Sequence, residues 1–228
     1  MDLRLSAGDP VESLAAALRA HLPARDTIAI VDAPRLPLAS GSAQRKIDLA
    51  LRRIVADRGN RLSMFPTPKL AEFEAFTADP QCKPHLVAIA RRIFGKSPLA
   101  SNVAPLPRGR LFTRFMLAGF ATHLALDTLG VRTYEGYPYL AFSLWKPPRV
   151  ELPPKSDRSA LAVRIAILRR LARILDIAIS VPTSLDEADA ASLAITTALC
   201  ARSSGMALAI SDAGEGQFLL AAPPVRGA

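Results

Sequence analysis

Short apolar runs and longer amphipathic stretches alternate along the chain. Residues 27–31 form a brief run rich in β-branched side chains, which predicts a buried strand that ends at Asp32. Before this run, apolar residues recur at helical spacing between Pro10 and Leu22, and Asp9 occupies the position of a helix N-cap. Strands and helices that alternate with short connections are typical of an α/β sheet, so we predict that fold class.

The rest of the chain continues this alternation. Ser184 and Glu187 have the spacing of a capping box, and Gly130 is placed to end a long helix. We predict one domain over residues 1–228, with an insertion of helix and loop at about 59–110. The predicted helices cover residues 43–58, 84–94, 111–129, 139–145, 158–177 and a segment after Ser184, and the predicted strands cover 131–135, 206–211 and 217–221.

The helix predicted over residues 158–177 contains a charge in an unexpected place. Its leucines and isoleucines form one apolar face, and Arg158, Arg169, Arg170 and Arg173 fall together on the opposite face. Arg164, however, projects from the middle of the apolar face. A buried guanidinium needs a carboxylate or phosphate partner, because an unpaired buried charge costs several kcal/mol. We therefore expect Arg164 to have a specific partner.

Three acidic residues come from segments that are far apart in the chain. Asp32 and Glu135 stand at strand ends, and Asp189 lies near a helix start on the side that faces the sheet. The carboxyl ends of parallel strands form the binding crevice of an α/β sheet. Carboxylates on rigid elements hold hard divalent cations, so we predict an Mg²⁺ or Mn²⁺ site made by these three residues. Lys155 or Arg164 would stabilise the transition state of phosphodiester cleavage.

Each of these acids also has an ordinary structural interpretation. Asp32 before Ala33 and Pro34 could begin a turn, and Glu135 could lie at an exposed sheet edge. Asp189 could be the ion-pair partner of Arg164 without any metal. A group of aromatic residues could stack on nucleobases, although core packing explains it equally simply. This group consists of Tyr134, Tyr137, Tyr139, Phe142 and Trp145.

Composition narrows the classes of partner. The net charge of +9 and the isoelectric point near 10.2 favour phosphate-bearing partners, unless the many arginines reflect genomic base bias. The chain has two cysteines and three dispersed histidines, so we expect neither a disulfide framework nor a structural zinc site. The N-terminal residues lack the pattern of a signal peptide, and the most apolar helix candidate is interrupted by charges. We therefore predict a cytoplasmic protein that does not span a membrane.

Several short motifs together resemble a known family. Their order and spacing are similar to those of domain-of-unknown-function family 429, whose members are predicted RNase H-like nucleases, over roughly residues 12–224. The resemblance implies an RNase H-like mixed sheet flanked by helices, with acids at Asp32, Glu135 and Asp189. The motifs are residues 30–34, the helix start at 45–48, residues 65–68, residues 134–138, Lys155 with Arg158 and Arg164, and residues 189–190.

The sequence departs from this family pattern at its beginning. Members usually open with a glycine-rich strand that ends in an aspartate and is followed by a hairpin, and we expect this part of the fold to be absent here. Its absence would expose an apolar sheet edge and remove one metal ligand. Three explanations remain: a start codon assigned too late, a partner chain that supplies the strands, and a degenerate member that binds without cleaving. The uncovered sheet edge would also favour a homo-oligomer.

The resulting functional hypothesis is a divalent-metal-dependent nuclease or phosphodiesterase of the RNase H-like class, either incomplete or inactive as the sequence stands. Its substrate would be DNA, RNA or a smaller phosphoester. The alternative is a non-catalytic protein that binds nucleic acid or forms a complex through its basic faces.

Overall fold

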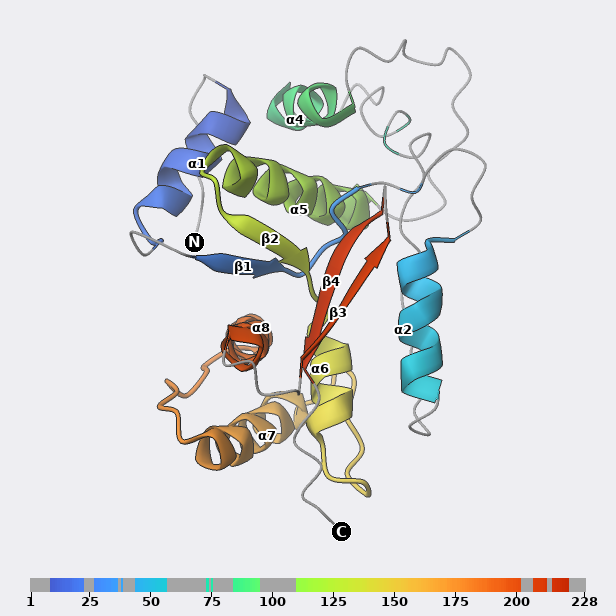
Figure 1. Ribbon diagram of the computed structural model, residues 1–228, viewed down its shortest axis with the longest axis vertical. Helices are drawn as coiled ribbons and strands as arrows, with labels where there is room; N and C mark the ends of the chain where they lie inside the picture. Colours follow the sequence, from blue (N-terminus) through green and yellow to red (C-terminus); the bar gives the residue numbers. More distant parts are fainter. Residues whose placement is uncertain are drawn as a thin grey trace.

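A single mixed sheet with helices around it forms the described part of the molecule (Figure 1). In these residues the chain forms seven helices and four strands, which confirms the predicted α/β class. The computed structural model describes residues 9–22, 27–36, 38, 44–56, 73, 75, 84–94, 110–201, 207–212 and 215–221.

The sheet brings the ends of two predicted strands together. Its order is β1-β2-β4-β3, in which β1, β2 and β4 are parallel and β3 is antiparallel to β4. Val31 is in register with Glu135, so Asp32 directly follows the residue opposite Glu135 at the carboxyl ends of the two strands. The strands are β1 (Ile28–Val31), β2 (Arg132–Glu135), β3 (Ala207–Asp212) and β4 (Gly216–Ala221).

Strand β1 differs from its prediction in burial. Its four residues are half-buried, whereas the apolar run predicted a fully buried strand. The reason is topological, because β1 pairs with β2 alone among the described strands and forms one edge of the sheet. An apolar sequence run reports affinity for a sheet but not whether both edges of the strand are covered.

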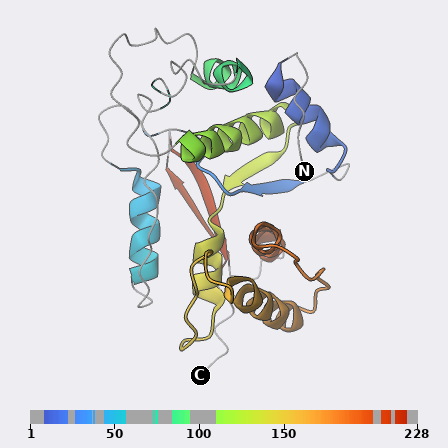
Figure 2. The same ribbon diagram turned by 180° about the vertical axis from the view of Figure 1, so that it is seen from behind.

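Three helices lie on one side of the sheet, where one of them contacts the strands and the other two pack on that helix (Figures 1 and 2). These are α1 (Pro10–Arg19), α4 (Pro84–Phe94) and α5 (Arg110–Thr128), and α5 contacts both β1 and β2. Asp9 caps α1 as predicted, since its Oδ1 accepts a hydrogen bond of 2.8 Å from the Val11 N–H. The core between these helices includes Val11, Phe73, Leu86, Leu117 and Phe120.

The remaining helices pack on the other side of the sheet and beside it. Helix α8 contacts β1 and β4, and it also packs against α6 and α7, whereas α2 contacts β3 (Figure 1). The Trp145 indole N–H donates a 2.8 Å hydrogen bond to the Ala221 carbonyl, which ties α6 to β4. These helices are α2 (Lys46–Ala56), α6 (Pro138–Trp145), α7 (Ala160–Leu175) and α8 (Leu185–Ala201).

Most predicted elements are confirmed within a few residues. The C-terminal hairpin is formed by β3 and β4, and Gly130 adopts a φ of 70° directly after α5 as a left-handed C-cap requires. Most of the predicted insertion at about 59–110 lies outside the described residues, which include from it residues 73, 75, 84–94 and 110.

Helix α5 approaches the end of β1 at a glycine. A Cβ atom placed on Gly119 would collide with the Cβ of Ala33, the residue that follows Asp32. On the same helix, His123 is buried, and its Nε2 donates a 3.2 Å hydrogen bond to the Ala33 carbonyl. Burial lowers the pKa of His123 to about 4, so the imidazole is neutral at physiological pH. Helix α5 therefore fixes the backbone that carries Asp32.

Because of this contact, we expect a glycine-to-alanine change at position 119 to destabilise the protein, although such a change usually stabilises a helix. In an exposed helix interior, replacing glycine by alanine normally stabilises by about 1 kcal/mol. For Gly119→Ala we expect instead a loss of roughly 1–3 kcal/mol in the free energy of unfolding, because the new methyl group overpacks the site against Ala33. Urea denaturation would measure this loss. Ala118→Gly, on the exposed side of the same helix, is the control and should cost only about 1 kcal/mol. Stabilisation by Gly119→Ala would contradict the close contact.

Candidate functional site

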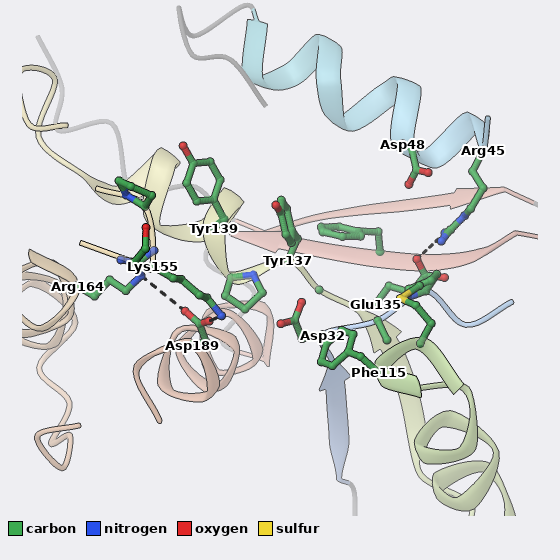
Figure 3. Close-up of a pocket in the computed structure, with 18 residues that line it drawn as sticks. Asp32, Arg45, Asp48, Phe115, Glu135, Tyr137, Tyr139, Lys155, Arg164 and Asp189 are labelled. Atoms are coloured by element: carbon green, nitrogen blue, oxygen red, sulfur yellow. Dashed lines mark hydrogen bonds and ion pairs between the residues drawn. The ribbon is translucent and has the colours of Figure 1, made fainter. Parts of the chain in front are cut away.

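A cavity of about 650 Å³ opens where β1 and β2 end (Figure 3). All three predicted acids line this cavity, and so do the two predicted basic residues, Lys155 and Arg164. In total, four acidic and three basic side chains contribute to its wall, so the described lining carries one more acid than base. The charged lining residues are Asp32, Arg45, Asp48, Glu135, Lys155, Arg164 and Asp189.

Asp32 occupies the middle of the cavity in the view of Figure 3. Its carboxyl group is partly withdrawn from water, and burial is the main reason that its pKa rises to about 7. The negative charge of Asp189 adds to this effect, whereas Lys155 opposes it. The carboxyl group of Asp32 therefore gains and loses its proton near neutral pH.

Asp189 connects Asp32 to two basic side chains. Its Oδ2 lies 2.5 Å from the Lys155 Nζ, and its Oδ1 lies 3.8 Å from the Arg164 Nε (Figure 3). The pair of Asp189 and Arg164 is buried, whereas Lys155 is 55% exposed. This ion pair confirms that the arginine on the apolar face of α7 has a carboxylate partner.

Arg164 is held rigidly beneath the cavity. Its Nη1 donates to the carbonyls of Ala160 at 3.1 Å and Pro153 at 3.4 Å, and its guanidinium lies 5.5 Å from the centre of the Phe142 ring. The Nε of Arg164 and the Oδ1 of Asp189 are nevertheless buried without a hydrogen-bond partner. These two atoms face each other at 3.8 Å, which is too long for a hydrogen bond, so they interact as a buried ion pair through charge alone.

Glu135 lies at the other end of the cavity and is already bonded. Its Oε2 lies 2.5 Å from the Arg45 Nη2, and its Oε1 accepts a 2.6 Å hydrogen bond from the Arg35 backbone N–H. Both partners favour the charged form of Glu135, but burial dominates and raises its pKa to about 7. Arg45 also donates to the Glu215 carbonyl at 3.3 Å, so it joins the start of α2 to the turn between β3 and β4.

Two glycines allow the strand ends and α8 to approach one another. A Cβ atom on Gly136 would collide with Ile30 of β1 and would lie 2.6 Å from Leu193 Cδ2 on α8. A Cβ atom on Gly216 would lie 2.8 Å from the Oε1 of Glu135, and its φ of 107° also disfavours other residues. Glycine at these positions therefore brings Asp189 on α8 and the hairpin turn close to the strand ends.

The acids differ in their capacity to hold a cation. Among the described residues, no group of three or more histidine, cysteine, aspartate and glutamate side chains has an arrangement that could hold a metal ion. Asp32 and Asp189 are the two acids that influence each other most directly, because the negative charge of Asp189 helps to raise the pKa of Asp32. Glu135 is engaged on both oxygens, and Asp189 forms ion pairs with Lys155 and Arg164. The three-acid metal site thus stays a prediction, and these two aspartates are its better supported part.

The aromatic group predicted from the sequence is divided between core and cavity. Phe142 and Trp145 are fully buried and pack edge to face, which confirms the core interpretation for them. Tyr137 and Tyr139 line the cavity, with ring centres 6.1 Å apart. Burial raises the pKa of Tyr137 to about 12, and the nearby charge of Asp32 contributes to this rise.

Two contributors to the cavity had no role in the predicted site. Arg45 belonged to the motif at 45–48, but its ion pair joins it to a residue 90 positions away, a separation for which a single sequence carries no signal. Phe115 belongs to α5, whose apolar residues suggested a core helix, yet this side chain is 52% exposed. An outward-facing large aromatic residue on the helical wheel of α5 was the available signal.

A comparison with protein families agrees with the motif pattern. The model of the family DUF429, described as "Protein of unknown function (DUF429)", matches residues 2–214. The chain belongs to this family. No curated protein and no solved structure matches the chain significantly. Membership in DUF429 therefore confirms the family resemblance, and the family description carries no activity.

The helices were also compared with the length and hydropathy needed to cross a bilayer. In the described part of the chain, none of them is long and apolar enough to do so.

Proposed function

We propose that this DUF429 member is a divalent-metal-dependent phosphodiesterase or nuclease of the RNase H-like class. The observation that carries the proposal is the pair of Asp32 and Asp189 in one cavity, next to Lys155 and Arg164. Two neighbouring carboxylates repel one another, and a divalent cation removes that repulsion. A parallel pair of strands that delivers acids at its carboxyl ends, flanked by helices on both sides, also supports an RNase H-like arrangement.

Each charged residue has a distinct role in this proposal. Asp32 and Asp189 would hold the cation, with Glu135 as a further ligand if Arg45 releases it. When bound, the cation would neutralise charge on the phosphodiester and activate water for attack. Lys155 is mostly exposed and reaches the same carboxylate, so its ammonium group can exchange Asp189 for a substrate phosphate oxygen. Arg164 is fixed by two carbonyls and supplies a positive charge that needs no reorganisation during the reaction.

Cation binding can be tested without measuring activity. We expect calorimetric titration with Mn²⁺ or Mg²⁺ to show binding to the wild-type protein, and we expect Asp32→Asn and Asp189→Asn each to weaken it at least tenfold. Asp176→Asn is the matched control, because this exposed residue loses the same charge, does not line the cavity and has a left-handed backbone that asparagine tolerates. Equal binding by all four proteins, or no binding by the wild type, would contradict the proposal.

A second candidate function is supported by the outer face of α7 and the loop before it. Its arginines are exposed and form a basic surface that can grip phosphates without catalysis. This basic surface consists of Arg158, Arg169, Arg170 and Arg173. Binding of DNA or RNA that weakens with salt, and that is unchanged in Asp32→Asn, would favour this non-catalytic function over hydrolysis.

A further inference from the structure

The walls of the cavity suggest which form of phosphodiester it accepts. Asp32 is partly buried, and the cavity around it is lined from the ends of the strands, from α2, α5, α6, α7 and α8, and from the loop at 154–156. The volume of about 650 Å³ falls within the roughly 300–1,000 Å³ that is usual for small-molecule sites. A cavity of this size can take up a single nucleotide, whereas an intact double helix is too wide to enter it, so the reacting nucleotide would come from a single strand or be extruded from a duplex.

Four aromatic side chains contribute to the wall of the cavity, namely Phe115, Tyr137, Tyr139 and Phe218. Phe115 and Tyr137 lie on either side of Asp32 in the view of Figure 3, and Tyr139 follows toward Arg164. Of the large hydrophobic side chains that are exposed in the described residues, Phe115 alone lines this cavity, whereas Leu36, Leu49 and Val181 do not. An aromatic side chain that is exposed at a charged pocket offers a flat apolar surface next to the polar groups.

Charge and aromatic surface are therefore combined in the manner that a nucleotide requires. Lys155 and Arg164 lie at one end with Asp189, and the aromatic side chains lie between this end and the pair of Arg45 and Glu135 (Figure 3). Phosphate is recognised by cations, and any nucleobase can stack on an aromatic ring irrespective of its sequence.

We propose that the cavity binds one unpaired nucleotide of a single-stranded nucleic acid, with its phosphate near Lys155 and its base against Phe115 and Tyr137. This inference rests on the proposed function, since it names the substrate class for the same site. The expected ligand is a single strand that carries bases. The alternative ligands are an intact duplex and a strand without bases, and the experiment below distinguishes them.

Fluorescence anisotropy tests the inference with three probes, in EDTA and in Mg²⁺. The probes are a labelled oligothymidylate, an abasic strand of the same length and a blunt duplex that contains the labelled strand. We expect the wild-type protein to bind the oligothymidylate more tightly than the other two probes. Phe115→Ala should weaken oligothymidylate binding roughly tenfold, as expected from the loss of one stacking contact, and should leave abasic-strand binding unchanged.

Two further variants keep this test specific. Phe115→Tyr should retain most of the affinity, because the ring is preserved. Val181→Ala is the matched control, since Val181 is 50% exposed and lies outside the cavity, and it should bind as the wild type does. The inference is overturned if the oligothymidylate does not bind, if Phe115→Ala binds it normally, or if the duplex or the abasic strand binds at least as tightly.

Failure of this inference can be told apart from failure of the proposed function. Binding that depends on Phe115, without cation binding or cleavage, would support the nucleotide pocket and reject the metal-dependent enzyme. Cleavage that requires Asp32 and Mn²⁺ but proceeds equally on abasic strands would support the enzyme and reject the base contact.

Discussion

Replacing Asp32 by asparagine is expected to stabilise the metal-free protein at pH 8 by about 2 kcal/mol. Burial and the charge of Asp189 raise the pKa of Asp32 from 3.8 to about 7. This shift corresponds to at most about 4 kcal/mol at 1.36 kcal/mol per pKa unit, and we halve it because Asp32 still borders solvent. The wild-type protein therefore carries an unfavourable charge at its candidate site, and the variant removes it.

The pH dependence gives this prediction its sign. Between about pH 4 and pH 7 the folded state holds a proton on Asp32 that the unfolded state has lost, so wild-type stability falls as the pH rises through this window. The advantage of Asp32→Asn should be absent below pH 4 and complete above pH 7. Urea denaturation at several pH values would measure it, with Asp176→Asn as the control. Equal stability of the two proteins at pH 8 would refute the burial of the charge.

Cation binding should reverse the order of the two proteins. Millimolar Mn²⁺ at pH 8 is expected to raise the melting temperature of the wild type, because a ligand that binds only the folded state stabilises it. Asp32→Asn should show no comparable rise. A site that is destabilising when empty and stabilising when filled is typical of functional carboxylates.

Removal of the Arg45 side chain is expected to have the largest effect on folding. In Arg45→Ala, Glu135 keeps its buried position but loses its ion-pair partner, which typically costs about 3–5 kcal/mol. The loss should be greatest at pH 8 and smaller at pH 5. The reason is that the pKa of Glu135, which burial already raises to about 7, rises further without Arg45, so that stability falls as pH increases. Denaturation at these two pH values would measure the effect.

A double-mutant cycle isolates this interaction. The double variant Arg45→Met with Glu135→Gln removes both charges. Its loss in free energy of unfolding should be smaller than the summed losses of Arg45→Met alone and Glu135→Gln alone. Arg53→Ala on the exposed side of α2 is the control and should change stability by less than about 0.5 kcal/mol. Additive effects of the two single changes would show that Arg45 and Glu135 do not form an energetically coupled pair.

The sequence predicted the elements well, because their signals are local. The spacing of apolar residues identified α4, α5 and α7, and the capping chemistry of Asp9 identified the start of α1. Arg164 was also interpretable, because a charge on an apolar helical face requires a partner wherever that partner comes from.

Other features depend on contacts that no local pattern encodes. Arg45 can pair with Glu135 because the start of α2 lies against the turn between β3 and β4. That contact joins Ile47 to Glu215, which are more than 160 residues apart in the chain. The same holds for the half-buried state of β1, which is set by the strand order of the sheet. The convergence of Asp32 and Asp189 could be proposed from the rule for strand ends, but the engagement of Glu135 by an arginine could not.

The contact between Gly119 and Ala33 links two positions 86 residues apart that share space for a single methyl group. Gly119 can acquire a side chain only if Ala33 loses its methyl group, so sequence change at position 119 is conditional on change at position 33. The position of the backbone next to Asp32 consequently depends on Gly119, a residue that has no side chain and no chemical role of its own.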